Sequence, residues 1–146
     1  MLGNWYFVYG TLLRGMSNHG LIEAATRQCH PASLPGVLYH LPQGYPMLVE
    51  EANGMVRGEA VLLEGDAAMA AALDRLEDFI APGHPGNLYE RVEREVTIDG
   101  SKEKVRCTVY VCPAQHREWV RKNCILVPGG DWRRFITSRS NSRPRS

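Results

Sequence analysis

Hydrophobic and polar positions change their spacing several times along the 146-residue chain, and each spacing predicts a different element. The apolar run at the start of Trp5–Gly15 has the aromatic and β-branched composition of a strand that is buried on both faces. Apolar runs at 47–49 and 55–63 predict further strands. Asn53-Gly54 lies between these two runs and predicts a hairpin turn.

A second pair of strands is expected in the C-terminal half. The stretch 88–98 alternates loosely between apolar and polar residues, as a strand with one exposed face does. In the stretch 104–112, apolar residues fall on every second position and share one face. Asp99-Gly100 separates the two stretches, so they predict a second hairpin.

One amphipathic helix is predicted between the two halves. Its apolar residues recur at spacings of three and four: Met69, Leu73, Leu76 and Ile80. Asp66 is the expected N-cap, and Pro82-Gly83 is expected to stop the helix. On a helical wheel, Asp74 and Asp78 fall on the solvent side, whereas Glu77 borders the apolar face.

These elements predict an α+β domain over residues 1–136 with a curled, mostly antiparallel sheet. The Ser/Arg-rich segment 137–146 has no large apolar side chain from Thr137 onward, so we expect it to be a disordered tail. A short helix is expected near 21–25, and a weak helix or loop at 117–122.

Composition narrows the class of protein. The chain is 44% hydrophobic and 23% charged, with a formal net charge of +1, so no global field favours nucleic acid or an anionic membrane. It has no apolar stretch of transmembrane length and no secretory signal pattern. The four cysteines show no metal spacing, and we interpret them as free thiols. A cytoplasmic protein is expected.

Glu77 is the most informative candidate for chemistry. A carboxyl group at the border of an apolar helix face is partly desolvated, which raises its pKa and favours proton transfer near neutral pH. The alternative is a structural glutamate that pairs with an arginine or reaches solvent. Tyr89 and Arg91 share one strand face, and Arg91 suits either a protein carboxylate or a ligand carboxylate.

Other chemistries find little support in the sequence. The five histidines are scattered without ligand spacing, which argues against a metal site. The GxSxG, P-loop and dinucleotide-binding patterns are absent from the sequence.

Several short motifs, taken in order, resemble one known family. They are VYGTLLRG, PGVLYHLPQGYPMLV, GMVRGEAVLL, LDRLEDF, LYERVEREV, VYVC and GGDW. Together they are similar to the γ-glutamylcyclotransferase-like family, which includes the AIG2-like proteins and the γ-glutamylamine cyclotransferases. The resemblance runs from about Trp5 to Trp132.

The resemblance implies a small mixed, mostly antiparallel β-barrel with one main helix, short helices and a cavity at one end. It places the acid/base at Glu77, beside an Asp78 that is Gly in many members. The substrate-binding residues that it implies are Tyr9, Gly10, Thr11, Leu12, Tyr89, Arg91 and Tyr110. No metal or organic cofactor is expected.

The implied reaction releases 5-oxoproline when the α-amine of a γ-glutamyl amine or peptide attacks its own γ-carbonyl. The alternative is a non-catalytic protein that keeps the same cavity to bind a small molecule. A third hypothesis is a nucleic-acid-associated protein that binds through the Arg-containing tail. Many compounds share the γ-glutamyl half, so the sequence does not identify the amine that leaves. The sequence does not indicate an oligomeric state either.

Overall fold

The computed structural model describes residues 4–65 and 67–142. Its strands are β1 (Asn4–Val8), β2 (Thr26–Pro35), β3 (Val37–His40), β4 (Pro46–Val49), β5 (Met55–Leu63), β6 (Glu90–Ile98), β7 (Lys104–Val111) and β8 (Ile125–Leu126). Its α-helices are α1 (Gly20–Glu23), α2 (Ala67–Leu76), α3 (Arg117–Asn123) and α4 (Trp132–Ser142). Two short 3₁₀ helices are η1 (Ala114–His116) and η2 (Pro128–Gly130).

Five strands close into a barrel in the order β1-β5-β2-β6-β7. All of its pairings are antiparallel except β1 with β7, which run parallel where Tyr6 meets Thr108. Buried side chains such as Phe7, Val61, Val96 and Val109 form its core. The predicted α+β class with a small mixed barrel is therefore confirmed, and so is the hairpin at Asp99-Gly100, because β6 pairs with β7 across it.

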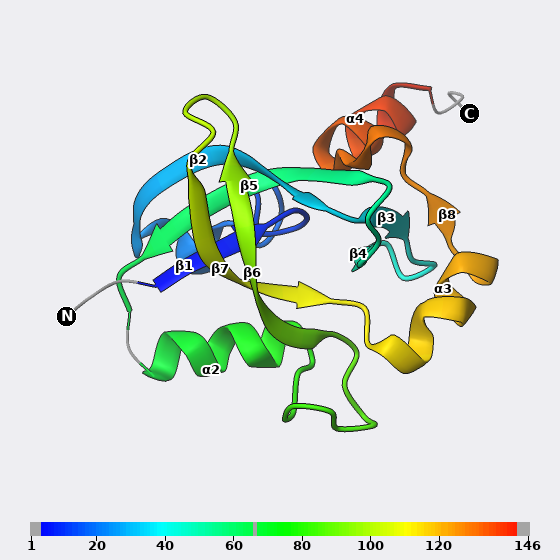
Figure 1. Ribbon diagram of the computed structural model, residues 1–146, viewed down its shortest axis with the longest axis horizontal. Coiled ribbons are helices and arrows are strands. Elements are labelled where there is room, and N and C mark those ends of the chain that lie inside the picture. The colour runs from blue at the N-terminus through cyan, green and yellow to red at the C-terminus, as the bar shows by residue number, and fades with distance from the viewer. Residues whose placement is uncertain (1–3, 66, 143–146) are drawn as a thin grey trace.

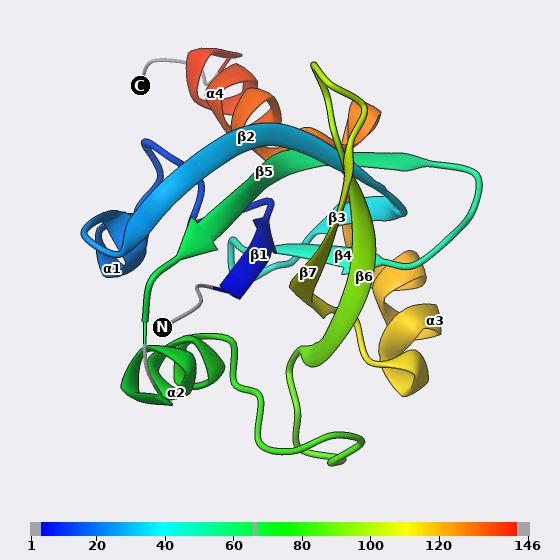
Figure 2. The same ribbon diagram turned by 60° about the vertical axis from the view of Figure 1, so that its left-hand side comes forward.

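A second, three-stranded sheet in the order β4-β3-β8 lies against the barrel. Figures 1 and 2 show α2 running beneath the barrel, with α3 beside the small sheet and α4 on the opposite side from α2. The main chain joins the two sheets where the Cys112 N–H, just after β7, donates to the carbonyl of Leu48 at 2.8 Å. This junction brings the β3–β4 loop close to the end of β7.

One prediction about the strands was wrong, and one strand was not predicted at all. Asn53-Gly54 does not turn a hairpin, because β4 pairs with β3 whereas β5 pairs with β1 and β2. The ten-residue strand β2 was not anticipated, because it holds two prolines and no regular apolar alternation. Its long ladder with β5 forms a wall of the barrel.

The helices also differ from expectation. Helix α2 ends at Leu76, so Ile80 lies beyond it and is 60% exposed instead of extending the apolar stripe. The expected N-cap Asp66 lies outside the described residues. Helix α4 continues through Ser142, so the segment 137–142 is helical and not disordered, and α2 is not the one main helix. Residues 143–146 lie outside the described residues.

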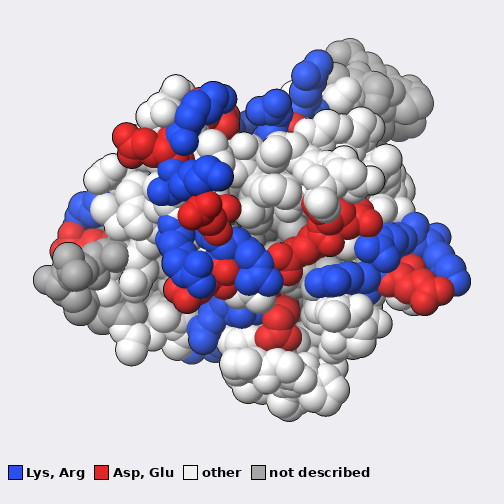
Figure 3. All heavy atoms as spheres, in the orientation of Figure 1, with Lys and Arg blue, Asp and Glu red and all other residues white. Residues whose placement is uncertain are grey.

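Charged side chains of both signs are interspersed on the face shown in Figure 3. Many of them form ion pairs across neighbouring strands or within α3, such as Lys104 with Glu95 and Lys122 with Glu118. No described helix is long and apolar enough to cross a membrane. All four cysteines are free, and Cys107 and Cys112 are buried.

Candidate active site

A cavity of about 320 Å³ opens between the end of β1, the end of α2 and the β3–β4 loop. Its walls come from residues far apart in the sequence: Tyr6, Phe7, Val8, Tyr9, Gly10, Thr11, Leu12, Asn18, Ile22, Tyr45, Pro46, Leu63, Leu73, Leu76, Glu77, Asp78, Leu88, Tyr89 and Tyr110. All of the predicted site residues except Arg91 line it.

Glu77 is the carboxylate most deeply set in this wall. It follows the last residue of α2, and its N–H still donates to the Leu73 carbonyl at 3.0 Å. Burial, and then the negative charge of Asp78, raise the pKa of Glu77 to about 7. Among the described residues, no Lys or Arg forms an ion pair with Glu77. Near neutral pH it is therefore available in both protonation states.

The backbone after Glu77 fixes how it leaves the helix. The Phe79 N–H donates to the Asp74 carbonyl at 2.9 Å, and the Asp78 N–H donates to the Arg75 carbonyl at 3.2 Å. This pair of bonds is a Schellman motif, in which Asp78 takes the left-handed conformation with φ of 51°. Glycine adopts that conformation most easily. This explains why glycine suits this position in the γ-glutamylcyclotransferase-like family that the sequence resembles.

The loop after β1 lines the cavity and contains main-chain donors that are unpaired within the described part of the chain. The Leu13 N–H donates to the Gly10 carbonyl at 3.0 Å and closes a turn. Asn18 braces it, since its N–H donates to the Thr11 carbonyl at 2.7 Å and its side-chain amide donates to the Thr11 hydroxyl at 2.9 Å. Among the described residues, none accepts a hydrogen bond from the N–H of Thr11 or Leu12. Both groups are free to bind an anion or a carbonyl oxygen.

Gly10 is required here because it lies against Pro46. Its φ is not positive, so the left-handed freedom of glycine plays no part. A Cβ atom at Gly10 would instead lie 2.3 Å from Cγ of Pro46, which is far inside van der Waals contact. The missing side chain lets the β3–β4 loop approach the end of β1 and close the cavity.

Two buried tyrosines hold the walls together. The Tyr9 hydroxyl donates to the Tyr110 carbonyl at 2.6 Å, and the Tyr89 hydroxyl donates to the Pro46 carbonyl at 2.6 Å. Burial holds the pKa of both phenols well above the usual value, and the nearby Glu77 charge acts in the same direction. Both hydroxyls therefore stay neutral and donate their hydrogen bonds to main-chain carbonyls.

Tyr110 and Arg91 both bind Asp74, which is not among the site residues predicted from the sequence. The Tyr110 hydroxyl donates to one oxygen of Asp74 at 2.7 Å, and the Arg91 guanidinium donates to the other at 2.6 Å. Arg91 also lies 4.6 Å from the ring centroid of Phe79. Arg91 thus pairs with a protein carboxylate, as one of its two readings predicted, but that carboxylate is Asp74 and not Glu77.

Asp74 was expected on the solvent side of α2, and its side chain is only 22% exposed. The helical wheel places it correctly away from the apolar stripe, but the wheel carries no information about β6 and β7, which cover that side. No cluster of three or more potential metal ligands occurs among the described residues.

Comparisons with known proteins agree with this geometry. Residues 6–134 match the family described as gamma-glutamyl cyclotransferase, AIG2-like, and the chain belongs to that family. A curated relative from Niallia circulans, the gamma-L-glutamyl-butirosin B gamma-glutamyl cyclotransferase, is 38% identical over 94 residues. That alignment covers 64% of this chain and 58% of the relative, so it spans less than two thirds of the relative's length.

Solved structures share the fold. The crystal structure of an AIG2-like protein from Mus musculus has a TM-score of 0.68 at 25% identity, covering 90% of this chain and 89% of the mouse chain. YkqA from Bacillus subtilis has a TM-score of 0.70 at 21% identity, covering 98% of this chain and 44% of YkqA. The chain thus spans less than half of YkqA, and this likeness concerns the fold alone.

Proposed function

We propose that this protein cleaves a γ-glutamyl amine or γ-glutamyl peptide and releases 5-oxoproline, with Glu77 as general acid and base. The observation that carries the proposal is a carboxyl group whose pKa is raised to about 7, set in a cavity that is also lined by Thr11 and Leu12, whose main-chain N–H groups are unpaired among the residues that the structure describes. Membership of the gamma-glutamyl cyclotransferase family supports the reaction class.

In this mechanism the α-ammonium group of the substrate gives a proton to the Glu77 carboxylate. The freed α-amine attacks the γ-carbonyl carbon, a new C–N bond closes a five-membered ring, and the attacking nitrogen loses its second proton to the solvent. The bond between that carbon and the leaving nitrogen then breaks, while Glu77 returns the proton to the leaving amine. No water is consumed, and Glu77 ends in its starting state.

Each part of the cavity has a role in this step. A positioned acid/base of this kind contributes ~10²–10⁴-fold to the rate. The N–H groups of Thr11 and Leu12 would hold the substrate carboxylate or the oxyanion that develops on the γ-carbonyl. Because the attack is intramolecular, the walls mainly have to fold the substrate so that amine and carbonyl meet.

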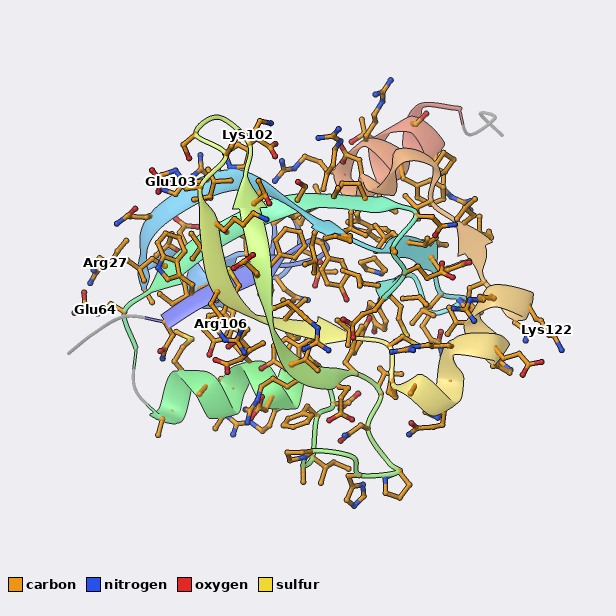
Figure 4. All side chains as sticks on the ribbon, viewed as in Figure 1. Arg27, Glu64, Lys102, Glu103, Arg106 and Lys122 are labelled. Carbon is orange, nitrogen blue, oxygen red and sulfur yellow. The ribbon has the colours of Figure 1, made fainter. Side chains whose placement is uncertain are left out.

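The Glu77→Gln variant tests the proposal. It keeps the size of the side chain and removes the proton transfer, so 5-oxoproline release should fall at least 100-fold while the far-UV circular dichroism stays unchanged. Glu118→Gln is the matched control and should retain full activity, because Glu118 is exposed and pairs with Lys122, whose side chain points outward from α3 in Figure 4. Unchanged turnover in Glu77→Gln would exclude Glu77 as the acid/base.

The same assay separates the enzyme from a binding protein. If the wild-type chain bound γ-glutamyl compounds in calorimetry but released no 5-oxoproline from any of them, the non-catalytic alternative would replace the proposal. The screen should include γ-glutamyl amides with small, cationic and aromatic leaving amines, since the reacting half is common to all of them.

A further inference from the structure

A second cavity of about 310 Å³ lies next to the first, between α3 and the β3–β4 loop, and we call it the α3 cleft. Most of its lining is apolar: Leu41, Met47, Leu88, Trp119 and Val120. Trp119 is 52% exposed, an unusual state for a tryptophan. An indole that stands open at the edge of an apolar cleft offers a flat surface for a ligand.

The α3 cleft adjoins the candidate active site. Leu88 lines both cavities. On the β3–β4 side, Pro46 lines the active-site cavity and the next residue, Met47, lines the cleft. Tyr45, which also lines the active-site cavity, is 45% exposed at this junction. A substrate whose γ-carbonyl lies near Glu77 would reach the cleft by passing Leu88.

The chemistry of the cleft favours a neutral, aromatic occupant. Its polar residues are Gln43 and His116, and none of the described residues that line it is an Asp or a Glu. The nearby acids Glu50 and Glu51 are engaged elsewhere, by Arg94 and Arg121. A cationic amine would thus lose water without gaining a counter-charge, whereas an aromatic ring would gain contact with the indole.

We propose that the α3 cleft is the subsite for the leaving amine and that it selects amines bearing an aromatic ring. This inference rests on the proposed function, because it assigns the half of the substrate that departs from the γ-carbonyl. The ring would lie against Trp119 and Val120, with the scissile amide beside Leu88.

The test compares three substrates with the same γ-glutamyl half: the amides of methylamine, phenethylamine and cadaverine. For the wild-type protein, kcat/KM for 5-oxoproline release should be at least tenfold higher for the phenethylamide than for the other two. A wild-type protein that turns over the methylamide with no preference for the phenethylamide would overturn the inference and leave the proposed function standing.

Trp119→Ala locates the preference. This variant should lower the ratio of kcat/KM for phenethylamide over methylamide at least fivefold, mainly through KM. Leu126→Ala is the matched control, because Leu126 is 53% exposed on β8 and does not line the cleft, so its ratio should equal that of the wild type. An unchanged ratio in Trp119→Ala would also overturn the inference.

A binding measurement makes the test independent of turnover. With the Glu77→Gln protein in calorimetry, the phenethylamide should bind at least fivefold tighter than the methylamide, and Trp119→Ala in the same background should remove the difference. If no substrate were turned over but this difference held, the proposed catalysis would fail while the cleft assignment survived. Equal affinities would overturn the assignment.

Discussion

The Tyr110 hydroxyl donates a 2.7 Å hydrogen bond to the carboxylate of Asp74, and this bond ties β7 to α2 beside the cavity. Because the phenol has a single proton and gives it to Asp74, its lone pairs remain as acceptors. Tyr110 lines the cavity, so it can accept a hydrogen bond from the α-ammonium group of a γ-glutamyl substrate. We therefore expect Asp74 to act on the substrate only through Tyr110, as a positioning residue.

Asp74→Asn should therefore weaken substrate handling without abolishing the reaction. We expect kcat/KM to fall about tenfold, and the free energy of unfolding to fall by about 1–3 kcal/mol as Arg91 loses its charged partner. Steady-state kinetics and chemical denaturation measure both effects. In a double-mutant cycle with Tyr110→Phe the two kinetic losses should be clearly non-additive. Additive losses would show that Asp74 does not act through Tyr110.

Gly10→Ala should destabilise the fold by about 1–3 kcal/mol, because its Cβ would lie 2.3 Å from Cγ of Pro46. Thermal unfolding measures the loss. Gly20→Ala is the control, since a Cβ at Gly20 meets no atom within 4 Å. Pairing Gly10→Ala with Pro46→Ala removes the contact and should restore part of the stability. If Gly10→Ala were as stable as Gly20→Ala, the tight approach would not exist in solution.

Asp78→Asn should move the acid limb of the pH profile to lower pH. Asp78 is the second cause, after burial, of the raised pKa of Glu77, and its removal lowers that pKa. Activity falls on the acid side as Glu77 is protonated, so kcat/KM should keep its plateau to more acidic values than in the wild type. Asparagine tolerates the left-handed conformation at this position, which limits structural side effects. An acid limb that stayed in place would remove Asp78 from the account of the Glu77 pKa.

Local pattern was sufficient to predict most of the barrel. The strands β1, β5, β6 and β7 are apolar runs or show apolar–polar alternation, and both patterns are typical of strands. The strand β2 was not predicted because its conformation is imposed by a long ladder with β5 and not by its own composition. Helix α4 was not predicted because its Ser- and Arg-rich end has no apolar residues at helical spacing.

The site could be predicted only in part, for a similar reason. Glu77 is visible in the sequence because its position relative to the apolar stripe of α2 implies burial. Asp74 owes its importance to Tyr110 and Arg91, which reach it from two strands that follow later in the chain. A helical wheel holds no such information. The close approach of Pro46 to Gly10 is equally a property of the folded chain.

Glu77 should also have a measurable cost in stability. Its pKa is 4.5 in an unfolded chain and about 7 in the folded protein, so folding favours the protonated form. Below pH 4.5 both states are protonated and the carboxyl group carries no penalty. As the pH rises toward 7, the unfolded state ionises first and gains stability, and above pH 7 the penalty is complete. The pKa difference corresponds to at most about 3 kcal/mol.

Glu77→Gln should therefore be more stable than the wild type at pH 8, by about 1–3 kcal/mol, and equally stable at pH 4. Urea denaturation at a series of pH values measures the difference, and Glu118→Gln serves as the exposed control, with a difference near zero throughout. The gain should develop between pH 4.5 and 7, and the proposed activity should rise around pH 7, where Glu77 ionises in the folded protein. A constant difference across this range would mean that Glu77 titrates normally, and its assignment as the proton-transferring group would fail with it.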